Sequence, residues 1–136
     1  MSPKELVKNF YESDLANCGV ESVEKYFHKD CTLNWNSSKG FTTLNYEEIK
    51  RLIIDINKSY DSVRMQISHL LEDGDFVTSR YTLYTSPIED VEAEEALAHF
   101  ITIWEVKDGK LFRGFEVSQL ADDSVKSRDS FKEIKV

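Results

Sequence analysis

Cysteine, proline and glycine are all scarce in this sequence. Its 136 residues include two cysteines, two prolines and five glycines. Cys18 and Cys31 have neither a CxxC spacing nor the spacing of metal ligands. We therefore expect buried free thiols rather than a metal site or a nucleophile. No internal repeat, low-complexity tract or linker interrupts the chain, so its length predicts a single domain.

Long apolar runs and positive charge are also lacking. No stretch approaches the roughly 18 to 20 apolar residues that span a bilayer, and the first residues, MSPKELVKNF, lack the apolar core of a secretory signal. There are 17 Lys and Arg against 25 acidic residues, a net charge of −8. With no basic stripe to offset it, this balance disfavours nucleic acid and anionic membranes as partners. Free thiols favour a cytoplasmic location.

Motifs for common cofactors and for hydrolases are missing as well. The sequence has no glycine-rich phosphate loop and no Gly-x-Ser-x-Gly elbow. His28, His69 and His99 lie far apart, without the short spacings of most histidine metal sites. We expect no cofactor and no metal, and histidines that form hydrogen bonds in the core or at an interface.

The strongest feature present is a β-hairpin over residues 99–120. Two runs rich in β-branched and aromatic residues, HFITIWEV and LFRGFEVSQL, flank Asp108-Gly109, a dipeptide that favours the tight turn of a hairpin. Large apolar residues occupy both alternating phases of each run, whereas a sheet with one wet face would show a polar phase. We therefore expect both faces of this hairpin to be covered.

The N-terminal half carries helix signals and the C-terminal half carries strand signals. A capping box at Ser2 and Glu5 opens a helix that we expect to end at Gly19, and Asn45 caps a second amphipathic helix. Alternating apolar residues after position 60 predict long strands. The other expected segments are a short helix over 20–27, a short strand over 31–35, a loop over 36–40, a solvated acidic loop over 86–96 and a tail over 121–136.

This order of elements predicts an α+β fold, because the helices precede an antiparallel meander. Three helices cover only one face of a curved sheet, so we expect a cavity between its concave face and the helices. The opposite face is also apolar, and we expect no other part of the chain to cover it. Since an apolar surface of that size is typical of an oligomer interface, the pattern predicts a homodimer packed through the convex sheet face.

Three segments, YFHKDCTLNW, EDGDFVTSRYTLY and IWEVKDGKLFRGFEV, resemble the nuclear transport factor 2-like superfamily and its SnoaL-like (polyketide cyclase-like) branch. The resemblance covers residues 3–120, and we assign one SnoaL-like domain to residues 1–120, followed by the tail. It implies a cone-shaped curved antiparallel sheet of four long strands and a short one, with three N-terminal helices over its concave face. Members include isomerases, cyclases, hydrolases, dehydratases and non-catalytic proteins, so the fold alone selects none of these activities.

The resemblance also suggests which residues face the pocket. Ketosteroid-isomerase-like members use a helix Tyr, an Asp base and a protonated Asp. Tyr11 matches the first, Trp35 stands at the second position, and the third falls near Thr102, within a shift of one residue, so we do not expect that chemistry. Gly114 would leave room for a ligand. The pocket residues implied by the overlay are Trp35, Phe100, Thr102, Trp104, Phe112, Gly114, Glu116 and Ser118.

Glu116 is the strongest chemical candidate. Among aromatic side chains its carboxylate would lose solvation, and its pKa would rise toward the range of a general base. We hypothesise that Glu116 abstracts a proton next to a carbonyl while Tyr11 donates a hydrogen bond to the oxyanion. In simpler interpretations, Glu116 pairs with Arg80 or Arg113 at the rim, and the Tyr11 hydroxyl only faces water. If the strand faces are inverted, His99 and Arg113 enter the pocket and Glu116 leaves it.

Three functions follow from these patterns. The first is a protein that binds a small hydrophobic molecule in an aromatic pocket. The second is a small acid–base enzyme of the isomerase, cyclase or hydrolase type that uses Glu116. The third is a protein-association domain, which has no need of a cavity and would be expected to have a collapsed one. The missing isomerase carboxylates favour ligand binding over catalysis.

Overall fold

A computed structural model describes residues 1–122 and 124–131 and confirms the α+β class. Within these residues, no helix is both long enough and apolar enough to cross a membrane. In chain order, the elements are α1 Pro3–Glu12, α2 Leu15–Tyr26, β1 Phe27–Ser37, β2 Gly40–Asn45, α3 Tyr46–Ser59, β3 Tyr60–Asp73, β4 Phe76–Pro87, β5 Glu95–Lys107, β6 Lys110–Leu120 and α4 Val125–Asp129.

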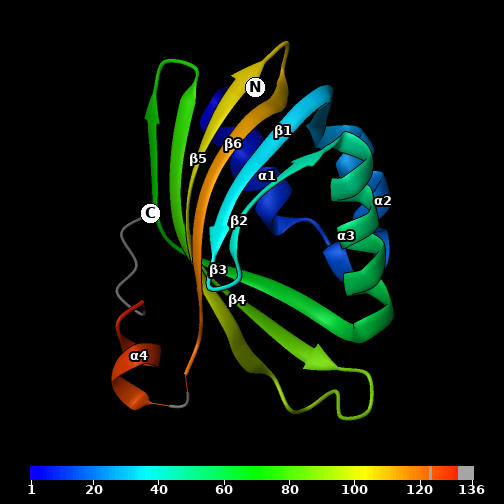
Figure 1. The fold of residues 1–136 in the computed structure, drawn as a ribbon, viewed down its shortest axis with the longest axis vertical. Coiled ribbons are helices and arrows are strands. Elements are labelled where there is room, and N and C mark those ends of the chain that lie inside the picture. Colours follow the sequence, from blue (N-terminus) through cyan, green and yellow to red (C-terminus); the bar gives the residue numbers. More distant parts are fainter. Residues whose placement is uncertain (123, 132–136) are drawn as a thin grey trace.

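The strands form one curved sheet in the order β2-β1-β6-β5-β4-β3. All neighbouring pairs are antiparallel except β1 and β6, which run parallel. Figure 1 shows α1, α2 and α3 on the concave side of the sheet and α4 on its other side. The predicted 99–120 hairpin is confirmed as β5 and β6, and both turn residues, Asp108 and Gly109, have positive φ angles (55° and 71°) as a tight turn requires.

The sheet has one more strand than the sequence predicts. The expected short strand over 31–35 is part of a longer β1, and most of the expected loop over 36–40 belongs to a β1–β2 hairpin. β2 pairs only with β1, at the edge of the sheet, and nearly all of its residues are exposed. Because neither face of β2 is buried, its sequence lacks the apolar alternation by which strands are recognised.

The first helix ends earlier than predicted. The capping boxes at Ser2 and Asn45 are both present, but α1 stops at Glu12, and Asp14 caps a new helix. The prediction that Gly19 ends the first helix is therefore wrong, because Gly19 lies inside α2. A Cβ atom at this position would overlap the side chain of Ile53 on α3. The glycine thus lets α2 and α3 approach closely rather than terminating a helix.

The convex face of the sheet is partly covered by the chain itself, contrary to the sequence-based expectation. The ring of Phe131, just after α4, lies 3.6 Å from the Arg80 guanidinium and 4.3 Å from the His99 ring. Arg80 also donates a hydrogen bond to the Ser130 carbonyl. No other described segment is in contact with the exposed apolar side chains of this face, which include Ile101, Ile103, Phe115 and Val117.

Candidate functional site

A cavity of about 350 Å³ lies against the concave face of the sheet. Its wall combines residues of α1, α2 and α3 with residues of β1, β3, β4, β5 and β6, and most of the lining is apolar. Among the described residues, Glu116 is the only acidic residue of the wall, and Lys39, in the β1–β2 turn, is the only basic residue that borders it. A concave, aromatic-lined site with few polar groups has the character of a small-molecule site.

Several of the expected pocket residues lie in this wall. Trp104 and Phe100 come from β5, Glu116 and Ser118 from β6, and Trp35 from β1. The sheet register explains this grouping, because Trp35 on β1 and Thr102 on β5 are the direct cross-strand neighbours of Glu116. Thr102 is fully buried beneath the wall. The Trp35 indole N–H donates to Ser118 Oγ at 2.8 Å, which fixes the orientation of that ring.

The two other expected pocket residues, Gly114 and Phe112, do not line the cavity. A Cβ atom at Gly114 would lie 2.5 Å from the Trp104 ring, so the space left by this glycine is filled by Trp104 and not by a ligand. Phe112 packs 5.0 Å from the ring of His28. The register between β5 and β6 shifts just beyond Glu105, which turns Leu111 instead of Phe112 into the core.

The Glu116 carboxyl group is held by two hydroxyl donors. Thr102 Oγ1 donates to Glu116 Oε1 at 2.7 Å, and Tyr81 Oη donates to the same oxygen at 3.2 Å. Burial raises the pKa of Glu116 to about 7, although these two hydrogen bonds oppose the shift. The carboxyl group is therefore partly protonated near neutral pH.

Neither arginine considered as a rim partner reaches Glu116. Arg113 pairs with Glu105 at 3.5 Å, and Arg80 is engaged with Ser68, with the Ser130 carbonyl and with the Phe131 ring on the convex side. Among the described residues, no ion pair involves Glu116. The carboxyl group is thus buried without a counter-ion, and this explains why burial dominates its pKa.

The Tyr11 hydroxyl is committed to partners within the protein. It accepts a hydrogen bond from Trp104 Nε1 at 2.9 Å and lies 2.7 Å from Ser79 Oγ. Ser79 in turn donates to the Thr102 carbonyl, so Tyr11 is the donor to Ser79. Burial raises the pKa of Tyr11, which keeps the hydroxyl neutral. With its proton directed at Ser79, Tyr11 is poorly placed to donate to a ligand oxyanion, and the structure lends no support to that part of the hypothesis.

Tyr81 is the site residue that sequence reasoning missed. Its hydroxyl contacts Glu116, its ring stacks on Phe100 with a centroid distance of 4.9 Å, and it lies 4.7 Å from the Tyr11 ring. Burial is the main reason that its pKa is raised well above the usual value. The sequence signal that could have placed Tyr81 in the core is its phase on β4. It shares that phase with Ser79 and Leu83, and all three side chains are buried.

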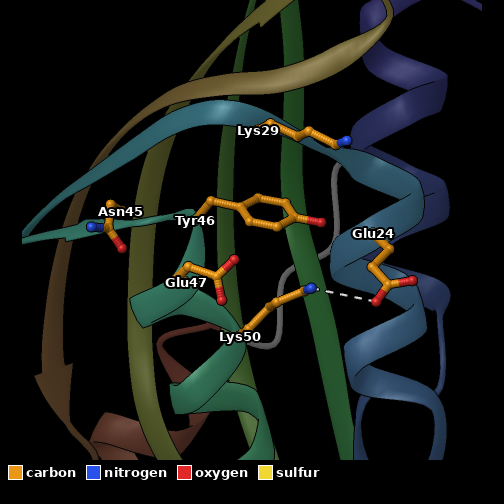
Figure 2. A pocket seen from close by; sticks show the side chains of 6 residues that line it. All are labelled: Glu24, Lys29, Asn45, Tyr46, Glu47 and Lys50. Carbon is orange, nitrogen blue, oxygen red and sulfur yellow. Dashed lines mark ion pairs between the residues drawn. The ribbon is translucent and has the colours of Figure 1, made fainter.

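A second depression lies outside the concave cavity, between α2, β1 and the start of α3. Figure 2 shows Lys50 directed at Glu24, with Tyr46 and Lys29 beside them. Lys50 Nζ lies 3.4 Å from Glu24 and 4.9 Å from the centre of the Tyr46 ring, so its charge is already compensated. Across the described part of the chain, no group of three His, Cys, Asp or Glu side chains is placed to hold a metal ion.

Comparison with known proteins places this architecture in a family. The model of the SnoaL-like domain matches residues 7–114, most of the chain. The chain belongs to the SnoaL-like domain family. Its expected membership of the nuclear transport factor 2-like superfamily and of this branch is thereby confirmed. No curated protein matches the sequence significantly.

Solved structures share the fold of this SnoaL-like protein at low sequence identity. IdmH, a putative polyketide cyclase from Streptomyces antibioticus, superposes with a TM-score of 0.70 at 14% identity over 87% of this chain and 92% of that chain. A hypothetical protein with a ketosteroid isomerase-like fold from Catenulispora acidiphila, in complex with trimethylamine, superposes with a TM-score of 0.66 at 15% identity over 99% of this chain and 96% of that chain. A phenazine biosynthesis-related protein from Pseudomonas aeruginosa superposes with a TM-score of 0.66 at 14% identity over 97% of this chain and 85% of that chain. These likenesses establish the fold alone.

Proposed function

We propose that this SnoaL-like protein binds a small, largely apolar molecule in the concave cavity. The observation that carries the proposal is the cavity of about 350 Å³, in whose largely apolar wall Glu116 is the only carboxyl group among the described residues, with both of its hydrogen bonds on Oε1. This volume lies at the lower end of the range of small-molecule sites, roughly 300 to 1,000 Å³. An open cavity also argues against a role limited to protein association, for which a collapsed interior would suffice.

Filling the cavity with a side chain should abolish ligand binding. Val63 is half-buried and lines the wall, so Val63→Trp places an indole in the ligand's space. With the neutral fluorescent probe N-phenyl-1-naphthylamine, we expect saturable binding to the wild type and at least about a tenfold loss of affinity in Val63→Trp. The matched control is Val91→Trp in the exposed acidic loop, which should bind like the wild type. A probe that does not bind the wild type, or binds both variants equally, contradicts the proposal.

A second candidate function is acid–base catalysis by Glu116. The observation that favours it is a carboxyl group whose pKa is raised to about 7 and whose Oε2 accepts no hydrogen bond from the described residues. With 2-tetralone as a test ketone in D₂O, the protein should speed deuterium exchange at the carbon next to the carbonyl. The rate should rise with pH through about 7 and vanish in Glu116→Gln. Equal rates for both proteins would exclude Glu116 as the base.

We further propose that two copies pack through the convex sheet face. Its exposed Ile101, Ile103, Phe115 and Val117 form the apolar patch that supports this assembly. Ile103→Lys places a charge in the middle of the patch, and we expect it to convert a dimer into a monomer in sedimentation equilibrium. Ile54→Lys, at an exposed position on α3, is the control and should leave the mass unchanged. A wild type that sediments as a monomer contradicts the proposal.

A further inference from the structure

The two oxygens of the Glu116 carboxyl group are not equivalent. Both of its hydrogen bonds, from Thr102 and from Tyr81, end on Oε1. Since a carboxylate oxygen offers two lone-pair directions, these two donors occupy both acceptor positions of Oε1. Oε2 is left as the atom that carries the proton of the neutral acid and that meets a ligand in the cavity. Glu116 therefore presents one defined oxygen to whatever enters.

No positive side chain of the described residues compensates a charge on that oxygen. Lys39 borders the cavity from an exposed turn, and the arginines nearest in the sheet are engaged elsewhere. Two titratable groups face Glu116 from the packed elements, Tyr11 of α1 and Tyr81 of β4, and burial raises the pKa of both, so both stay neutral. The ionised carboxylate thus lacks the counter-ion that makes a buried charge tolerable.

The rest of the wall combines aliphatic side chains with a large set of aromatic rings. Aromatic rings attract cations through their quadrupole, and cages of them recognise methylated ammonium groups. A neutral ligand would use only the apolar area of these rings and would leave the charged form of Glu116 without a partner. The aromatic residues of the wall are Phe10, Tyr11, Phe27, Trp35, Tyr60, Tyr81, Phe100 and Trp104.

We propose that the cavity takes a cationic ligand, a tertiary or quaternary ammonium group on an apolar body, with Glu116 Oε2 as its counter-ion and the aromatic wall around it. The inference rests on the proposed function, because it names the class of molecule that this cavity binds. The net charge of −8 would favour the approach of a cation to the protein. Binding of the cation stabilises the ionised carboxylate, so it expels the proton from Oε2 when the solution is near neutral pH.

A pair of probes with the same shape and different charge tests the inference. Phenyltrimethylammonium carries a permanent positive charge, and tert-butylbenzene is its neutral isostere. By calorimetric titration at pH 8 we expect the wild type to bind the cation at least about tenfold more tightly than the isostere. In Glu116→Gln this preference should fall to about twofold or less, because the counter-ion is gone. At pH 7, titration in two buffers of different ionisation enthalpy should detect proton release in the wild type and none in the variant.

Glu105→Gln is the matched control. Glu105 lies next to Trp104 in β5, in the opposite phase, and pairs with Arg113, so its loss should change neither the preference nor the proton release. The cationic-ligand inference is overturned if the wild type binds both probes with equal affinity, or if the preference for the cation survives in Glu116→Gln. In either case, binding of N-phenyl-1-naphthylamine would still support the proposed function of the cavity. If that neutral probe also fails to bind, the proposed function falls together with this inference.

Discussion

Glu116→Gln should be more stable than the wild type at pH 8, by about 3 kcal/mol in the free energy of unfolding. Burial raises the pKa of Glu116 from 4.5 to about 7, so the folded protein binds a proton that the unfolded chain has already lost in this interval. The stability of the wild type therefore falls as the pH rises from about 4.5 to about 7 and is flat above that range. Glutamine mimics the neutral acid at all pH values, so the variant lacks this loss.

Urea unfolding followed by tryptophan fluorescence at pH 5 and at pH 8 measures the effect. Burial lowers the pKa of His99, and this histidine is present in both proteins. Its contribution to the free energy of unfolding has the opposite pH dependence, because it is lost as the pH falls below about 6.5. The difference between wild type and Glu116→Gln removes that contribution. Glu105→Gln, which removes a carboxyl group outside the cavity, is the control and should not show the gain in stability at pH 8. A difference between wild type and Glu116→Gln that is the same at both pH values would show that Glu116 is not buried as a partly protonated acid.

The hairpin over residues 99–120 was predictable because its turn is encoded by Asp108-Gly109 and because large apolar residues occupy both alternating phases of its strands. Large apolar residues in both phases are a signal that a sequence displays clearly. Within the described residues, however, the convex phase still exposes Ile101, Ile103, Phe115 and Val117, so the expectation that both faces are covered holds only in part. β2 leaves no such signal because it is an exposed edge strand. Gly19 was misinterpreted because close approach of two helices and a helix end both favour glycine, and only the position of Ile53 separates the two causes.

The candidate site was predictable in part for the same reason. The alternation of β5 and β6, with the family overlay, was sufficient to group Trp104, Glu116 and Ser118. It failed at Phe112, since a register shift between the strands turns Leu111 inward and alternation alone does not reveal a bulge. Tyr81 was missed because its bond to Glu116 joins residues 35 positions apart, on strands that are not neighbours in the sheet. Contacts of this kind come from sheet curvature, which a single sequence does not display.

Trp104→Ala should lower the free energy of unfolding by about 3 to 5 kcal/mol, the usual range for deleting a buried aromatic side chain. The Trp104 side chain is 3% exposed, its ring meets the Phe27 ring edge-on at 5.5 Å, and its N–H donates to the Tyr11 hydroxyl. Trp104→Phe keeps a ring and loses the N–H donor, so we expect a smaller loss, about 1 to 3 kcal/mol. Urea unfolding measures both, and an alanine variant no less stable than the phenylalanine variant contradicts this account.

The contact between Trp104 and Gly114 allows the position of the indole to be tested by a second substitution. A Cβ atom at Gly114 would press against Cζ3 and Cε3 of Trp104 and against Cδ1 of Leu33, so Gly114→Ala should cost about 1 to 3 kcal/mol in the wild type by overpacking. In the Trp104→Ala background the two contacts with the indole are gone, and only the contact with Leu33 Cδ1 remains. The two substitutions should then be coupled, with a double-mutant cycle giving an interaction energy of at least about 1 kcal/mol. Additive losses would show that the indole does not occupy the space above Gly114.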